Sequence, residues 1–313
     1  MDMYQKRKIR AEKKNNNQEE KLTKVGINWY PGHMVKAQNE IKESLKLIDI
    51  IVEILDARIP IASRNPIISE LAKDKKRIIV LNKKDLADSK KTKEFVKYFE
   101  KQGYVCIEVN SSDKNDIKKI VDSINKLGKE IYDEKNKNKS IDIKPIYRAL
   151  IAGIPNVGKS TIINKISGKN SANVGNKPGV TVKKQWIRVD NNIDLLDTPG
   201  ILWPNLSDKN AGIKLALTGN IKQEILDEEE LACYGIDILI NDPEYKNLLK
   251  EKYKLENEDF ENIAYDILEI IGRKRGCVIS GGNIDMSRAA KLFLDELKAG
   301  KIGNVTIEDL PVL

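Results

Sequence analysis

The sequence predicts an α/β fold with a largely parallel sheet, followed by a smaller, mainly helical domain. Over the first two thirds of the chain, short apolar runs typical of buried strands alternate with amphipathic segments of helical period. One of these strands leads through a glycine-rich loop directly into a helical segment. After residue 204 the strand pattern fades and helical segments follow one another. A chain of 313 residues that is 40% hydrophobic is large enough for two such domains.

Strands and helices are expected to alternate regularly in the first domain. A helix at residues 35–47 precedes a strand at 48–55, a β-branched run with the composition of a buried parallel strand. The other strands are expected at residues 77–81, 104–109, 146–152, 184–189 and 193–196, and the helices between them at residues 66–72, 92–101 and 117–131. The polar residues 190–192 indicate a hairpin-like turn. Later helices are expected at residues 210–219, 228–234, 245–253, 259–271 and 287–299.

The charge pattern divides the chain into three parts, residues 1–24, 25–204 and 205–313. Residues 1–24 have almost no apolar periodicity, which predicts a solvated basic extension, either a frayed helix or an RNA-binding arm. Lysine and arginine number 55 against 47 aspartate and glutamate, and this net charge of +8 favours polyanionic partners. The basic excess lies in the first two parts. The helical domain is acidic overall, apart from a basic stretch at residues 273–301.

Cysteine usage and hydropathy favour a cytoplasmic protein. Cys106, Cys233 and Cys277 lie far apart without a C-x-x-C pair, which argues against a disulfide framework and a zinc site. No apolar run approaches the roughly 18–20 residues that span a bilayer. The sequence shows no signal-peptide core and no prenylatable cysteine, so we expect no membrane partner.

Residues 153–160 match the phosphate-loop pattern G-x-x-x-x-G-K-[ST], between an expected strand and an apolar helical stretch. In such a loop, glycines let backbone N–H groups point at phosphates. We expect Lys159 to neutralise the β- and γ-phosphates during catalysis and the hydroxyl of Ser160 to bind Mg²⁺. The alternative is a chance glycine-rich turn, which the flanking strand and helix disfavour. The residues expected to contact the nucleotide here are Asn156, Val157, Gly158, Lys159, Ser160 and Thr161.

Two further segments are candidates for sensing the γ-phosphate. Residues 197–200 read D-x-P-G after a strand, so Asp197 is expected in the Mg²⁺ shell and the N–H of Gly200 at the γ-phosphate. A Gly/Asn-rich loop ends at Thr181, whose hydroxyl is expected to join the Mg²⁺ only when the γ-phosphate is present. The alternative for this loop is a surface segment without a ligand.

The expected base is guanine. Asn-Lys-Lys-Asp at residues 82–85 matches N-K-x-D and follows a strand. The carboxylate of Asp85 can accept the N1–H and the exocyclic amine of guanine, whereas adenine would leave it unpaired. We expect Asn82 to brace the loop and Lys83 to lay its aliphatic stem on the ring, while backbone N–H groups after the next strand reach the guanine carbonyl. The residues expected to contact the base are Asn82, Lys83, Lys84, Asp85, Ser111 and Ser112.

The order of these motifs is unusual. In most small GTPases the phosphate loop precedes N-K-x-D, whereas here residues 82–85 come before residues 153–160, which indicates a circularly permuted P-loop GTPase domain. The polar, Lys/Asn-rich residues 133–144 have the composition of a tolerant joint. The permutation leads the chain from residues 197–200 directly into the helical domain. We therefore expect loss of the γ-phosphate to reposition that domain.

Together with these motifs, the sequence resembles the ribosome biogenesis GTPase A family of permuted GTPases over residues 27–313. The resemblance also rests on Trp-Tyr-Pro-Gly-His-Met at 29–34 and on residues 56–60, 63–66, 197–204 and 272–282. It implies a GTPase that binds the maturing large ribosomal subunit late in assembly, contacts ribosomal RNA and acts as a timing switch. It also implies that the helical domain helps to bind RNA. We expect no DNA partner and a monomer when the protein is free.

The resemblance leaves the catalytic group open. Ile201 stands where many signalling GTPases have a water-orienting Gln, so intrinsic hydrolysis is expected to be slow. His33, the only histidine, either positions the attacking water or packs beside Trp29 and Tyr30, or touches RNA. Asn156 matches the pattern of GTPases in which K⁺ replaces an arginine finger; alternatively, it only braces its loop.

Three classes of function fit these features. The first is hydrolysis of GTP to GDP and phosphate, stimulated by the ribosomal particle. The second is a binding module in which the nucleotide only locks an RNA-binding conformation. The third, a membrane-recruited signalling GTPase, is disfavoured because the sequence shows no anchor motif. The sequence favours the first.

Overall fold

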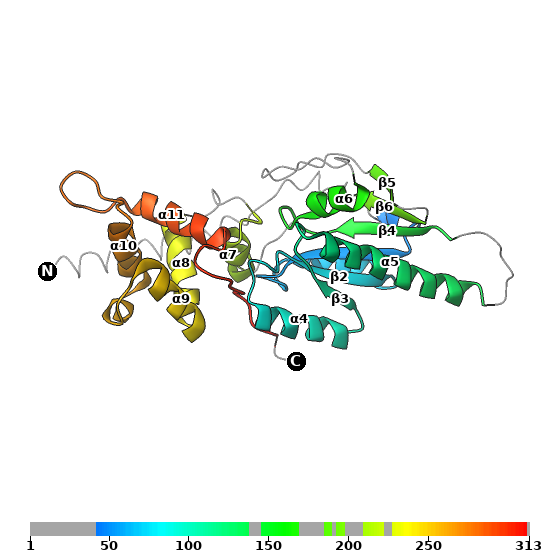
Figure 1. The fold of residues 1–313 in the computed structure, drawn as a ribbon, viewed down its shortest axis with the longest axis horizontal. Coiled ribbons are helices and arrows are strands. Elements are labelled where there is room, and N and C mark those ends of the chain that lie inside the picture. The colour runs from blue at the N-terminus through cyan, green and yellow to red at the C-terminus, as the bar shows by residue number, and fades with distance from the viewer. Residues whose placement is uncertain are drawn as a thin grey trace.

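The structure, a computed structural model, describes residues 42–137, 145–168, 185–189, 192–197, 209–221 and 227–311. Within these ranges six strands form one sheet in the order β3-β2-β1-β4-β6-β5 (Figure 1). All neighbouring strands are parallel except β5 and β6. The strands are β1 (Ile50–Asp56), β2 (Lys76–Asn82), β3 (Val105–Glu108), β4 (Tyr147–Ala152), β5 (Gln185–Val189) and β6 (Ile193–Asp197). The predicted α/β fold with a largely parallel sheet is confirmed.

Helices cover both faces of the sheet, because alternate residues of a buried strand point to opposite sides. All residues of the central strand β1 are buried. Its residues Ile50 and Val52 pack in one core cluster with α5 and α6, whereas Ile51 packs with α3 and Leu55 with α4 on the other face. These helices are α3 (Pro66–Leu71), α4 (Ser89–Lys101), α5 (Lys114–Lys135) and α6 (Lys159–Ser167).

The helical domain packs around apolar side chains that are continuous with the core on one face of the sheet. Helices α8, α10 and α11 contact one another, and Leu231, Leu268 and Phe293 are fully buried there. In Figure 1 this domain lies at one end of the sheet, with α7 nearest to it. The elements are α7 (Lys209–Leu217), α8 (Glu228–Ile240), α9 (Pro243–Tyr253), the 3₁₀ helix η2 (Glu258–Glu261), α10 (Ala264–Lys274) and α11 (Met286–Lys298).

After α11 the chain returns to the sheet domain (red in Figure 1). The carboxylate of Glu308 accepts hydrogen bonds from the backbone N–H groups of Ile61 and Ala62, at 2.7 and 3.1 Å. Burial raises the pKa of Glu308, while the neighbouring Lys214 and the two backbone donors favour the charged form. Residues 300–311 are here called the C-terminal segment. Through Glu308, this segment connects the last helix of the helical domain, α11, to the loop after β1.

The predicted elements agree with the structure in type, and several differ in extent, among them the helix expected at residues 117–131, which spans Lys114–Lys135. The helix expected at residues 259–271 is wrong as a single element, because it is divided into η2 and α10. Asn262 between them has an extended backbone, and its side-chain amide donates to the carbonyl of Asp259. The helix expected at residues 228–234 continues to Ile240. The expected helix at residues 35–47 is described only from residue 42, and the domain boundaries predicted at residues 24 and 204 lie outside the described residues.

The structure also describes the three cysteines and the lengths of the helices. Cys106, Cys233 and Cys277 are free thiols, and burial raises the pKa of Cys233 to about 12. Among the helices that the structure describes, none combines the length and the apolar character needed to cross a membrane.

Candidate nucleotide-binding site

The phosphate loop connects β4 to α6, in the position that the sequence predicted. Gly153 and Gly158 have positive φ angles of +148° and +101°. A Cβ at Gly158 would lie 2.2 Å from Nδ2 of Asn82, and one at Gly153 would lie 2.5 Å from the carbonyl oxygen of Ile54. Both positions thus need glycine for conformation and for space. Gly158 is the N-cap of α6, so the unpaired N–H groups of the helix start face the loop.

Two charged side chains of the phosphate site are buried. The ammonium group of Lys159 donates to the carbonyl of Ile154 at 2.7 Å. Burial lowers the pKa of Lys159 to about 8, against the opposing effect of the nearby Asp197 carboxylate. Asp197 ends β6 and is paired in register with Ile151 of β4, which directly precedes the loop. Ser160 stands in the first turn of α6. A hydroxyl, a carboxylate and phosphate oxygens are the ligand types that Mg²⁺ prefers.

The guanine loop follows β2 and is joined to the phosphate loop by one side chain. Nδ2 of Asn82 donates to the carbonyl of Val157 at 2.7 Å, and the side-chain Oδ1 of Asn82 accepts from the N–H of Ser111 at 3.2 Å. The bracing role expected for Asn82 agrees with these contacts. The N–H of Ser112 donates to the side chain of Asn110, so both expected guanine donors have acceptors inside the protein.

The remaining guanine-loop residues differ in their surroundings. Lys83 has a φ of +63°, and its ammonium group lies 2.9 Å from Asp56. Lys84 forms an ion pair with Asp116 at 2.6 Å. Asp85 is exposed and forms no hydrogen bond or ion pair with another described residue, which suits a carboxylate that receives a ligand.

A cluster around Asp56 lies beside the guanine loop. Asp56 is fully buried at the carboxyl end of β1 and accepts from Nε and Nη2 of Arg58, at 2.9 and 2.8 Å. Nδ2 of Asn220, from the helical domain, donates to the same carboxylate at 3.0 Å. The pKa of Asp56 is well below its usual range. Burial alone would raise this pKa, but the positive charges and hydrogen bonds of Arg58 and Lys83 lower it by more than burial raises it.

The chain is similar to several known GTPases over most of its length. The family model for 50S ribosome-binding GTPases matches residues 148–272. Ribosome biogenesis GTPase A of Bacillus cereus is 46% identical, with 90% of this chain and 93% of that protein covered, and the Thermotoga maritima protein of the same name is 35% identical over 90% and 94%. The crystal structure of GNP-bound YlqF from T. maritima matches with a TM-score of 0.56 and 30% identity, covering 87% of this chain and 97% of that one.

The chain belongs to the ribosome biogenesis GTPase A family. As a ribosome biogenesis GTPase, it binds guanine nucleotides and hydrolyses GTP. The resemblance given by the sequence motifs is confirmed. Mouse mitochondrial ribosome-associated GTPase 1 is also similar, at 31% identity with 90% of this chain and 89% of that protein covered.

Several predicted site residues of this ribosome biogenesis GTPase lie outside the described residues, namely His33, Thr181 and Gly200, as does the basic extension at residues 1–24. Asn156, the candidate K⁺ ligand, has a φ of +60°, and its Nδ2 donates to the carbonyl of Gly219 at 3.1 Å. No group of three or more His, Cys, Asp or Glu side chains within the described ranges is arranged to hold a metal ion. A Mg²⁺ site made largely of phosphate oxygens and water does not need such a group.

The hydrogen-bonded cluster of Asp56, Arg58 and Asn220 was not expected from the sequence. Asp56 and Arg58 entered only as part of a family signature, and Asn220 was not singled out. One signal was available, since charged residues at the carboxyl end of a buried parallel strand lie where α/β folds bind ligands. Nothing in the local sequence of Asn220 points to Asp56.

Proposed function

We propose that this GTPase binds the maturing large ribosomal subunit and acts in a late step of its assembly, with GTP hydrolysis as a timing and release switch. The observation that carries the proposal is the contact of the phosphate loop with the helical domain, through Asn156 and the carbonyl of Gly219. Through this contact, a change in the phosphate loop on GTP hydrolysis can alter the position of the helical domain, which the family resemblance associates with RNA binding. The printed name of the B. cereus relative, ribosome biogenesis GTPase A, supports the ribosomal setting.

The chemistry that we propose uses the residues predicted from the motifs. Lys159 neutralises charge on the β- and γ-phosphates, and Ser160 and Asp197 hold Mg²⁺, which when bound neutralises further phosphate charge. Thr181 and Gly200 sense the γ-phosphate, and His33 positions the attacking water. Asn156 provides a ligand for K⁺. The protein alone hydrolyses GTP slowly, and the ribosomal particle stimulates the reaction.

The proposed RNA contact lies on the sheet domain and on α11. Arg273 and Arg275 form ion pairs with Glu269 and Glu296, so much of their charge is already balanced. Arg288 and Lys291, by contrast, are exposed on α11, and neither forms an ion pair with another described residue. Side chains of this kind neutralise backbone phosphates with little loss of existing contacts. The GTPase acts in the cytoplasm and is a monomer when free.

The test is multiple-turnover GTP hydrolysis by the full chain alone and with large-subunit precursors, mature large subunits or small subunits. We expect precursors to raise the rate at least about tenfold, which is a modest part of the roughly 10³–10⁵-fold gain that completing a GTPase site can provide. Lys159→Ala is the control that removes the chemistry. A rate that is the same with and without large-subunit particles would refute the proposed assembly role.

The competing binding-module function predicts a different result for His33→Ala. If this variant loses hydrolysis but still matures subunits at the normal rate, turnover is incidental and the nucleotide only locks a conformation. If maturation stops with hydrolysis, the switch function is supported.

The proposed RNA contact is tested by salt dependence. The slope of log affinity against log salt is about −0.9 for each duplex phosphate that is neutralised. Arg288→Ala is expected to make the slope less steep by about one phosphate. Arg273→Ala is the matched control, since the Arg273 side chain already pairs with Glu269, and we expect it to change the slope less. A flat salt dependence for the unaltered protein would refute the RNA contact.

A further inference from the structure

The turn Thr218–Asn220, which ends α7, has a fixed backbone. The N–H of Asn220 donates to the carbonyl of Leu215, and the N–H of Gly219 donates to the carbonyl of Ala216. With Gly219 at a φ of +75°, these two bonds form the Schellman motif that closes a helix. The carbonyl and side-chain groups of the turn are therefore held in defined directions by α7.

This turn contacts both nucleotide loops. The carbonyl of Gly219 accepts from Nδ2 of Asn156 in the phosphate loop at 3.1 Å. One residue later, Nδ2 of Asn220 donates to Asp56, beside the guanine loop, at 3.0 Å. Asn220 is fully buried, so the second bond is shielded from water. A single turn of the helical domain thus connects the two loops that read the phosphates and the base.

Asp56 transmits the second contact to the guanine loop. Its Oδ2 accepts from Asn220, from Nη2 of Arg58 and from the ammonium group of Lys83. Hydrogen bonds to a charged group are stronger than those between neutral groups, and more so when buried. The direction of the Lys83 side chain is therefore set by a carboxylate that the helical domain itself helps to hold.

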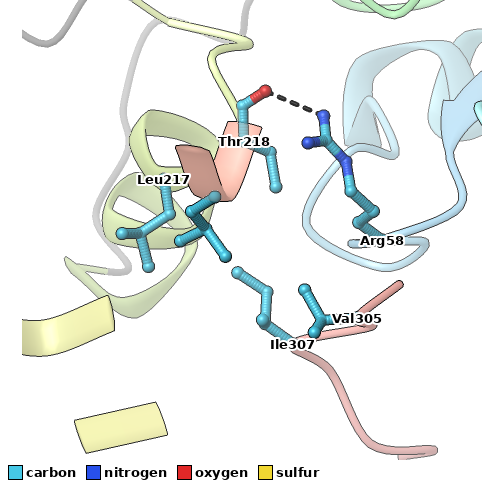
Figure 2. A pocket seen from close by; sticks show the side chains of 6 residues that line it. Arg58, Leu217, Thr218, Val305 and Ile307 are labelled. Atoms are coloured by element: carbon cyan, nitrogen blue, oxygen red, sulfur yellow. Dashed lines mark hydrogen bonds between the residues drawn. The ribbon is translucent and has the colours of Figure 1, made fainter. Parts of the chain in front are cut away.

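The joint around this turn is tightly packed (Figure 2). The guanidinium group of Arg58 points at the carbonyl of Thr218 and donates to it at 2.8 Å. Below it, Leu217, Val305 and Ile307 face a cavity of about 10 Å³, which is hardly large enough for one water molecule. The turn cannot move away from the nucleotide loops without opening this packing and breaking the buried bond of Arg58.

We propose that the turn Thr218–Asn220 is a structural part of the nucleotide site, in which Asn220 and Asp56 are positioning residues for Lys83 and the carbonyl of Gly219 positions Asn156. Guanine nucleotide affinity then depends on whether the helical domain is seated on the sheet domain. By linkage, bound nucleotide favours the seated state by the same factor. The proposal rests on the guanine nucleotide site of the family and is independent of the ribosomal partner.

The first test is the Kd for GDP of the full-length Asn220→Ala variant, without ribosomes. The expected result is a rise of at least about fivefold, the lower end of typical coupling between sites. Tyr253→Phe is the matched control, because it removes a partly buried hydrogen bond from the Tyr253 hydroxyl to Glu296. This bond lies inside the helical domain and does not involve the turn. Tyr253→Phe is expected to lower the melting temperature without changing the Kd. An unchanged Kd in Asn220→Ala would overturn the proposal.

A double-mutant cycle tests the route through Asp56. In an Asp56→Asn background, Asn220→Ala is expected to change the Kd by less than about twofold, since residues that act through one another are not additive. A full effect of Asn220→Ala in that background contradicts the proposed route.

Amide hydrogen exchange of the unaltered protein, measured with and without GDP, tests the proposal even if the variants do not fold. We expect GDP to slow exchange in peptides from residues 209–221 and from the C-terminal segment, although neither contains a motif for the nucleotide. If GDP leaves exchange in both peptides unchanged, the helical domain does not sense the nucleotide and the proposal is wrong. Because no ribosomal particle is present, these results are separate from the test of the proposed function.

Discussion

Replacing Asn82 by alanine tests how the phosphate and guanine loops are joined. Asn82 is 1% exposed, and its side chain satisfies the carbonyl of Val157 and the N–H of Ser111. A buried polar group that loses its partner costs about 1–3 kcal/mol, and Ser111, which is only partly buried, falls at the lower end because water can reach it. We expect Asn82→Ala to lower the free energy of unfolding by about 2–4 kcal/mol.

The same change should weaken nucleotide binding. If about 2 kcal/mol of the loss falls on the geometry of the bound state, the Kd for GDP rises about 30-fold. Urea unfolding and titration with a fluorescent GDP analogue measure the two effects. Asn82→Asp is the informative companion, because it can still accept from Ser111 but cannot donate to Val157, and we expect a comparable loss of stability. An Asn82→Ala protein with unaltered unfolding and unaltered Kd would refute the role of this side chain as the link.

Three further outcomes follow from the geometry. Gly158→Ala places a Cβ 2.2 Å from Asn82 at a φ of +101°, so GDP binding measured by calorimetry should be lost, and binding at the unaltered Kd would contradict this. Burial raises the pKa of Asp116, but hydrogen bonds from Lys119 and Lys84 outweigh it and lower the pKa to about 2. Its stabilisation is therefore present above the unfolded pKa of 3.8 and lost as pH falls towards 2. In urea unfolding, Asp116→Asn should cost about 2 kcal/mol at pH 7 and almost nothing near pH 2, and a pH-independent difference would show the sign to be wrong. Glu308→Ala should lower the free energy of unfolding by about 2–4 kcal/mol and speed amide exchange at residues 57–62, and unchanged exchange there would show that Glu308 does not hold this loop.

The parts of the fold that the sequence predicted are those specified locally. A β-branched run such as residues 48–55 carries its own strand signal, and the glycines of residues 153–160 mark a loop whose backbone only glycine permits. The guanine motif was likewise visible because its residues are adjacent in the chain. The division of residues 259–271 into two helices was not visible, since it depends on a side-chain hydrogen bond of Asn262.

The cluster around Asp56 could not be predicted from local patterns. Asn220 lies 164 residues from Asp56, and Arg58 lies 160 residues from Thr218, so their hydrogen bonds exist only once both domains are folded and docked. An Asp-x-Arg sequence by itself is compatible with any exposed turn. Only tertiary structure turns these residues into a buried charge network next to the guanine loop.

The C-terminal segment also has a consequence for the order of folding. Glu308 accepts from the N–H of Ile61 across 247 residues of sequence. During synthesis, N-terminal regions fold first and contacts of high sequence separation form late. The N–H groups of Ile61 and Ala62 therefore gain their acceptor, the Glu308 carboxylate, only after almost the whole chain has been synthesised. The strands and helices of the sheet domain can thus form during synthesis well before Asp56 and Arg58 make their hydrogen bonds to the turn Thr218–Asn220.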